Sequence, residues 1–100
     1  MSKEPDVDPI RKERERAWIG DAVLGLFARK WILNTYDKMD SDLFAGLTSN
    51  QFLSSFGNPT SVEARIGEIY ESSGLDEAFL YLERELIPLF LKQQKNKGRL

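Results

Sequence analysis

Two acidic residues stand in stretches of sequence that are otherwise apolar or small. Asp21 lies inside "ERAWIGDAVLGLF", which reads as a helix meant for burial, and Glu63 lies beside the apolar positions of "SVEARIGEIYESSG". An ionised carboxylate among apolar groups is unfavourable unless a cation, a metal or strong donors compensate it. The chain has no histidine and no cysteine. A metal held by this pair would therefore be a hard ion with oxygen ligands, such as magnesium, manganese or calcium.

Small residues accompany both acids at helical spacing. Gly25 follows Asp21 by one turn, and Gly67 follows Glu63 by one turn. Glycine inside a helix is less favourable than alanine by up to about 1 kcal/mol, so its presence suggests that another backbone approaches closely. We expect the two helices to cross closely and to bring the carboxylates together. The rows are Ala17, Asp21, Gly25 and Ala28 on one helix, and Glu63 and Gly67 on the other.

The residues alone leave other interpretations of both acids open. Thr60-x-x-Glu63 matches a capping box, in which Glu63 would only bond the backbone of the cap residue. Asp21 could form a structural ion pair with Arg65, Arg29 or Lys30, and the small residues could serve helix packing alone.

The apolar pattern predicts an all-α domain of four to five helices. A helix is expected from Ile10 to Asn34 or Thr35, because apolar residues recur there every three or four positions. These residues are Trp18, Ile19, Ala22, Val23, Phe27 and Trp31. Asp40 or Ser41 should cap a short helix ending at Leu47, and Thr48 or Ser49 a second. The helix of Glu63 should end at Gly74, and the last should start at Asp76 and break near residue 87 because of Pro88.

Charge is distributed unevenly over the 100 residues. Positions 17–91 carry five basic and eleven acidic residues, whereas the last nine, "KQQKNKGRL", carry four basic residues and no acidic one. We expect a flexible lead-in over residues 1–9, one domain over residues 10–91 and a basic tail over residues 92–100. The tail is either a solubilising end or an arm that contacts phosphate. The charged N-terminus and the short apolar stretches predict a cytoplasmic protein with no membrane partner.

Three segments resemble the ribonuclease III endonuclease domain family. "IGDAVLGL" resembles the family's "LGDAVLEL", "LTSNQFL" resembles "LVSNxxLA", and "VEARIGEIYESSGLDEA" resembles "FEALIGAIYLDSGLEAA". The three occur in the family's order over most of residues 16–80. The resemblance implies a compact, all-helical and usually homodimeric domain that cuts double-stranded RNA with magnesium.

The resemblance also implies roles for single residues. Asp21 and Glu63 match the family's catalytic metal-binding acids, and Asn50 matches a polar position of the middle motif. Full-length enzymes carry two further acids where this chain has Ala17 and Thr60, but the short Mini-ribonuclease III type resembles this chain at both places. Only twelve residues, Gln51 to Val62, separate Asn50 from Glu63, where the family usually has a longer segment.

The combined prediction is a homodimeric, magnesium-dependent endoribonuclease of minimal size. Manganese should be able to substitute, and the substrate would be double-stranded or structured RNA, for instance a ribosomal RNA precursor. The alternative is a non-catalytic scaffold of the same fold that binds RNA or protein. Asn50 and Thr60 would support the site. The basic residues expected to contact RNA are Arg11, Lys12, Arg14, Arg16, Lys95 and Lys97.

Overall fold

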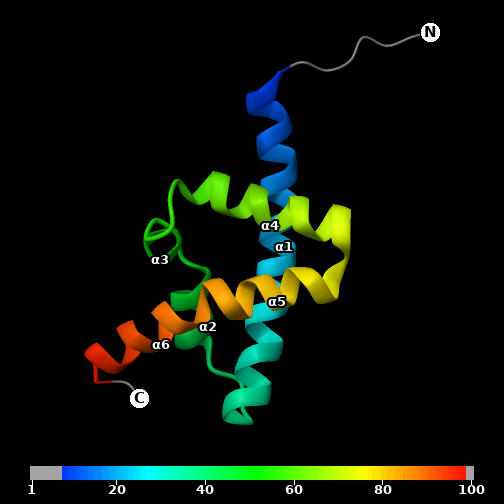
Figure 1. The fold of residues 1–100 in the computed structure, drawn as a ribbon. Helices are drawn as coiled ribbons and strands as arrows, with labels where there is room; N and C mark the ends of the chain where they lie inside the picture. Colours follow the sequence, from blue (N-terminus) through cyan, green and yellow to red (C-terminus); the bar gives the residue numbers. More distant parts are fainter. Residues whose placement is uncertain (1–7, 99–100) are drawn as a thin grey trace, which may run out of the picture.

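A computed structural model describes residues 8–98 of the chain, and this part is all-helical (Figure 1). Six helices follow one another, with no strand among the described residues. They are α1 (Pro9–Tyr36), α2 (Ser41–Thr48), α3 (Asn50–Leu53), α4 (Pro59–Ser73), α5 (Leu75–Glu85) and α6 (Ile87–Asn96). The prediction of an all-α fold is confirmed, and the last predicted helix is divided into α5 and α6.

Side-chain caps and prolines explain where the helices begin and end. The carboxylate of Asp40 accepts the backbone N–H of Leu43 at 2.9 Å at the start of α2, and Ser49 Oγ accepts the N–H of Phe52 at 3.0 Å at the start of α3. Both satisfy donors that a first helical turn leaves free. Pro88 lies in the first turn of α6, directly after the break at Leu86, as its missing N–H predicts.

The two longest helices form the centre of the molecule. α4 makes its most extensive contact with α1, and α5 returns alongside α4 after the turn at Gly74. In Figure 1 the α4–α5 pair crosses α1, while α2, α3 and α6 gather beside the C-terminal half of α1. The core contains residues from all six helices, including Leu24, Leu47, Leu53, Ile66, Leu82 and Phe90.

The molecule is longer in one direction, with extents of 57 × 23 × 21 Å. Helix α1 projects beyond α4 at its N-terminal end and beyond α5 at its C-terminal end (Figure 1). Residues 1–7 of the predicted lead-in and residues 99–100 of the predicted tail lie outside the described residues. Helix α6 continues to Asn96, so part of the predicted tail is helical. Among the described helices, none combines the length and the apolar character that crossing a membrane requires.

Candidate metal-binding site

The site is built on a direct backbone contact between α1 and α4. A Cβ atom added to Gly20 would overlap the carbonyl oxygen of Glu63 and lie 2.9 Å from the backbone nitrogen of Gly67. A Cβ atom added to Gly67 would in turn overlap the carbonyl oxygen of Arg16. Both helices therefore require glycine here, because any side chain would force them apart.

The close crossing predicted from the small residues is present, but on α1 it uses a different glycine. Gly20 makes the contact, whereas a Cβ atom on Gly25 would meet only the end of the Arg29 side chain, at 3.2 Å. The predicted row of small residues on α1 included Gly25 but not Gly20, which makes this contact. The contact lies one residue before Asp21, and the carboxylate consequently sits at the edge of the crossing and not inside it.

This crossing brings the carboxyl groups of Asp21 and Glu63 together. Burial, a hydrogen bond with Asp21 and the negative charge of Asp21 raise the pKa of Glu63 from 4.5 to about 7. The hydrogen bond requires a protonated Glu63 carboxyl that donates to the Asp21 carboxylate. Two carboxyl groups that share one proton form a site where a cation can replace that proton.

The pair opens into a concave surface of about 340 Å³ between α1 and the start of α4. Arg14 supplies a positive charge beside the two acids, and Thr60 supplies a hydroxyl. Trp18 also borders this surface, with 78% of its side chain exposed. The sequence predicted Thr60 as a supporting residue of the site and Arg14 as an RNA contact. In the structure both line the same hollow as Asp21 and Glu63.

The structure does not contain the capping box that was considered as the role of Glu63. Helix α4 is capped by Asn58, whose side chain accepts the N–H groups of Thr60 at 2.9 Å and Ser61 at 3.3 Å. The capping box from Thr60 to Glu63 was therefore a wrong alternative, since the helix is already capped two residues earlier, at Asn58, and Pro59 is its first residue.

Of the three cations considered as partners of Asp21, Arg29 and Arg65 contact other groups, and no salt bridge within residues 8–98 joins Lys30 to Asp21. The guanidinium of Arg29 donates to the Gly25 carbonyl oxygen at 3.2 Å and lies 4.3 Å from the ring centroid of Phe44. Arg65 lies over the Tyr81 ring, at 5.9 Å. Within residues 8–98, no ion pair joins Asp21 to a basic side chain. Asp21 therefore has no salt-bridge partner within 4.0 Å in this part of the chain.

A second concave surface, of about 500 Å³, continues from Asp21 along α1 towards α2. It is lined by residues of α1 and α2, among them Ala22, Gly25, Leu26, Arg29 and Phe44. Asp21 thus has a basic residue in the hollow on either side, Arg14 in one and Arg29 in the other. Sequence reasoning missed Arg29 as a site residue, although its spacing of eight from Asp21 places it about two turns further along the same side of the helix.

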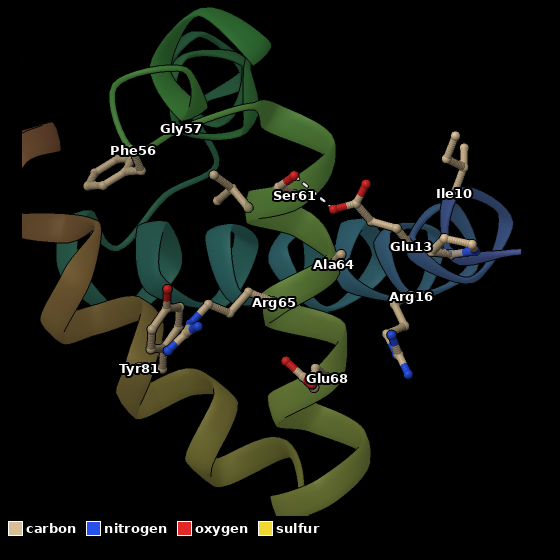
Figure 2. A pocket seen from close by; sticks show the side chains of 12 residues that line it. Ile10, Glu13, Arg16, Phe56, Gly57, Ser61, Ala64, Arg65, Glu68 and Tyr81 are labelled. Atoms are coloured by element: carbon tan, nitrogen blue, oxygen red, sulfur yellow. Dashed lines mark hydrogen bonds between the residues drawn. The ribbon is translucent and has the colours of Figure 1, made fainter. Parts of the chain in front are cut away.

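The other basic residues predicted to contact RNA are dispersed. Arg16 lines a separate cavity of about 630 Å³ (Figure 2), where Ser61 Oγ donates to Glu13 at 2.8 Å. Lys97 lines a cavity between α2, α3 and α6. The remaining three are exposed on helix surfaces: Arg11, Lys12 and Lys95.

Asn50 does not join the acids. It is the exposed first residue of α3, and it borders neither of the two hollows that contain Asp21. The predicted supporting residues thus separate, with Thr60 at the site and Asn50 outside these hollows.

The residues of the site suit a hard divalent ion that retains most of its water. Magnesium typically takes one or two carboxylates from a protein and completes its octahedral shell with water or phosphate oxygens. Asp21 and Glu63 provide two such carboxylates at an open position, where Asp21 is exposed and Glu63 is partly buried. Within residues 8–98, no group of three or more acidic side chains is gathered as a metal cage.

Comparisons of the chain with known protein families, with curated proteins and with solved structures found no match.

Proposed function

We propose that this protein is a magnesium-dependent endoribonuclease that cuts double-stranded or structured RNA, acting as a homodimer in the cytoplasm. The observation that carries the proposal is the pair of carboxyl groups of Asp21 and Glu63, which share a proton at the α1–α4 crossing. The three segments that resemble the ribonuclease III family place their two metal-binding acids at the same two residues. The physical and the sequence arguments therefore point to one site.

The proposed roles follow from the chemistry of each group. Asp21 and Glu63 hold the ion, and they lose their shared proton when it binds. Magnesium supplies positive charge that favours ionisation of water and neutralises the oxygens of a phosphodiester. Thr60 lies beside Glu63 and can orient water by a hydrogen bond. Manganese has similar ligand preferences and should substitute for magnesium.

Two arginines are placed to orient the RNA backbone. Arg14 and Arg29 belong to the hollows on either side of Asp21, and guanidinium groups bind phosphate through parallel hydrogen bonds. The acidic body would otherwise repel RNA, so local cations beside the carboxylates support phosphate binding. Arg14 was among the contacts predicted from the sequence, and Arg29 is added by its position.

Dimerisation is supported by apolar side chains on the exposed face of α1. Trp18, Leu26 and Leu33 are 78%, 43% and 46% exposed and follow one another by about two turns. An exposed apolar stripe of this kind is typical of an interface with a partner. In analytical ultracentrifugation we expect a dimer, and Trp18→Ala should shift the population towards monomer. A wild-type monomer at tens of micromolar would contradict this part of the proposal.

The decisive experiment is cleavage of long double-stranded RNA by the purified protein in magnesium and in manganese. We expect short products from the wild type and none from Asp21→Asn or Glu63→Gln, each checked for folding by circular dichroism. Glu71→Gln is a matched control, because Glu71 is exposed on the same helix two turns after Glu63. Cleavage that persists in both variants would remove the two acids from the mechanism.

A second candidate is a non-catalytic scaffold of the same fold that binds RNA or protein. It is favoured by the fact that no third acidic side chain accompanies the pair within residues 8–98. Absence of cleavage at high protein concentration, together with retained RNA binding in gel shift, would select this alternative.

A further inference from the structure

A buried polar side chain without a hydrogen-bond partner for its oxygen lies on α6, far from the two acids in sequence. Gln94 is only 5% exposed, and its Oε1 atom has no hydrogen-bond partner within residues 8–98. A buried acceptor without a partner is unfavourable, whereas leucine would fill the same space without this penalty. Packing therefore does not explain a glutamine at this position.

Gln94 belongs to the lining of a cavity of about 550 Å³ between α2, α3 and α6. The Phe52 and Phe90 rings contribute its apolar wall, with ring centroids 5.5 Å apart. Gln51 and Gln93 contribute amides and Lys97 contributes an ammonium group. The cavity thus combines an apolar wall, an inner acceptor that lacks a donor, and one positive charge.

The charge of this cavity differs from that of the protein. No carboxylate belongs to its lining, although the chain has a net charge of −2. The hollows along α1 each contain an acidic residue. An anionic ligand would therefore meet attraction from Lys97 and no opposing carboxylate in the walls.

We propose that this cavity binds one unpaired nucleotide, with the base edge hydrogen-bonded to the amide of Gln94 and the phosphate close to Lys97. Each base carries a neighbouring N–H donor and acceptor on one edge, which is the complement of a glutamine amide. The unmet Oε1 atom needs such a donor, and the Phe52 and Phe90 rings provide apolar surface against which a base can pack. The phosphate of the nucleotide would pair with Lys97, the one basic residue of the cavity lining.

This inference deepens the proposed function, and it rests on that function for RNA as the source of the nucleotide. It gives this domain a means of holding single-stranded RNA next to a structured region. The cavity shares no residue with the Asp21–Glu63 site. The two proposals can therefore fail independently.

The test uses the Asp21→Asn protein without magnesium, so that neither cleavage nor metal binding contributes. The side-chain amide of Gln94 is followed by ¹H–¹⁵N NMR during titration with each of the four ribonucleoside 5′-monophosphates, with a single-stranded tetraribonucleotide and with inorganic phosphate. We expect saturable shifts of the Gln94 amide with at least one nucleotide and with the tetranucleotide. Inorganic phosphate should leave this amide unchanged.

Two variants address the base contact. Gln94→Leu should abolish the saturable shifts of the backbone amides of Gly46 and Lys97 while circular dichroism shows an intact fold. Gly46→Ala adds a methyl group 3.9 Å from Gln94 Nε2, in ordinary contact with Phe90 at 3.5 Å. It should narrow the cavity and weaken binding without disturbing the helices.

A matched pair of lysines addresses the phosphate contact. Lys97→Ala should raise the Kd roughly fivefold, as expected for one partly screened charge-assisted contact. Lys92→Ala should have no effect, since Lys92 is exposed on the same helix and outside the cavity. The proposal is overturned if no nucleotide saturates the Gln94 shift at 10 mM, on the order of the weakest binding that such contacts allow. It is also overturned if phosphate alone reproduces the shift, or if Gln94→Leu binds like the parent protein.

Discussion

Within residues 8–98, the Asp21–Glu63 pair lacks a salt-bridge partner and Gln94 Oε1 lacks a hydrogen-bond donor, yet the two sites differ in exposure. The acids lie at an open edge of the α1–α4 crossing, whereas Gln94 is 5% exposed among α2, α3 and α6. A charged pair is tolerable only where water or a cation can reach it, while a neutral amide can be enclosed at smaller penalty. The difference indicates a cation at the first place and a neutral hydrogen-bond donor at the second.

The two places also differ in what fixes their geometry. The acids depend on backbone contact, because Gly20 and Gly67 let α1 and α4 touch. The cavity of Gln94 depends on side chains, and its own glycine, Gly46, has ordinary contact distances to its neighbours. A single added methyl group should therefore disrupt the first place and only narrow the second.

The largest expected effect comes from Gly20→Ala or Gly67→Ala. Either new Cβ atom would overlap a carbonyl oxygen of the facing helix, and backbone cannot move aside as a side-chain end can. We expect a loss of roughly 3 kcal/mol or more in the free energy of unfolding, measured by urea denaturation.

Gly25→Ala is the matched control on the same helix. Its Cβ atom would meet only the flexible end of Arg29, at 3.2 Å, and alanine is favoured over glycine in a helix interior by up to about 1 kcal/mol. Equal destabilisation by Gly20→Ala and Gly25→Ala would show that the backbone contact does not govern the crossing.

The helix boundaries and the proximity of the two acids could be predicted from the sequence, because their signals are local. The caps at Asp40 and Ser49 and the break before Pro88 follow from residue types at single positions. The proximity of Asp21 and Glu63 followed from glycines at helical spacing. The choice of Gly20 over Gly25 could not be predicted, because it depends on the rotation of α1 against α4, which packing across the whole core decides.

The cavity of Gln94 had no sequence signal. Its residues come from three separate segments, and "KQQKNKGRL" has the composition of a solvated tail. Gln94 is the buried polar residue of α6 among the described residues. It follows Phe90 by one turn, and Phe90 packs against Phe52 and Trp31 at centroid distances of 5.5 and 6.0 Å. Tertiary contacts therefore created this site, whereas the acids were visible as exceptions within an apolar pattern.

The next largest effect is stabilisation by magnesium. A ligand that binds only the native state stabilises it by about 2.7 kcal/mol at 100 times its Kd. We expect magnesium or manganese to raise the Tm of the wild type and of Glu71→Gln, and to have little effect on Asp21→Asn. Equal stabilisation of Asp21→Asn would mean that the ion binds elsewhere. The contrast between a cation site at Asp21–Glu63 and a neutral ligand site at Gln94 would then no longer hold.

A smaller effect of opposite kind is expected at the second place. Gln94→Leu removes the unmet acceptor and keeps the volume, so the free energy of unfolding should rise by about 1 kcal/mol. Urea denaturation of the ligand-free protein measures this change. Destabilisation by Gln94→Leu would mean that the amide has a partner in the folded protein, and the argument for a ligand there would lose its basis.

The smallest effect is the pH dependence that Glu63 contributes. Its pKa is about 7 in the folded protein, against 4.5 ordinarily, so the native state retains a proton that the unfolded chain releases between these values. The stabilisation is therefore complete below pH 4.5 and is lost as the pH rises through 7. Because Glu63 is partly exposed, solvent screening reduces the change to about 1 kcal/mol.

Glu63→Gln separates this contribution from every other titrating group. Without the titrating carboxyl, the fall in Tm between pH 5 and pH 8 should be shallower than in the wild type. Magnesium should reverse the trend in the wild type, since the ion competes with the shared proton and binds better as the pH rises. A Tm gain from magnesium that is the same at pH 5 and pH 8 would mean that the ion does not displace this proton. The acids and Gln94 would then differ in exposure alone, and not in the kind of ligand they take.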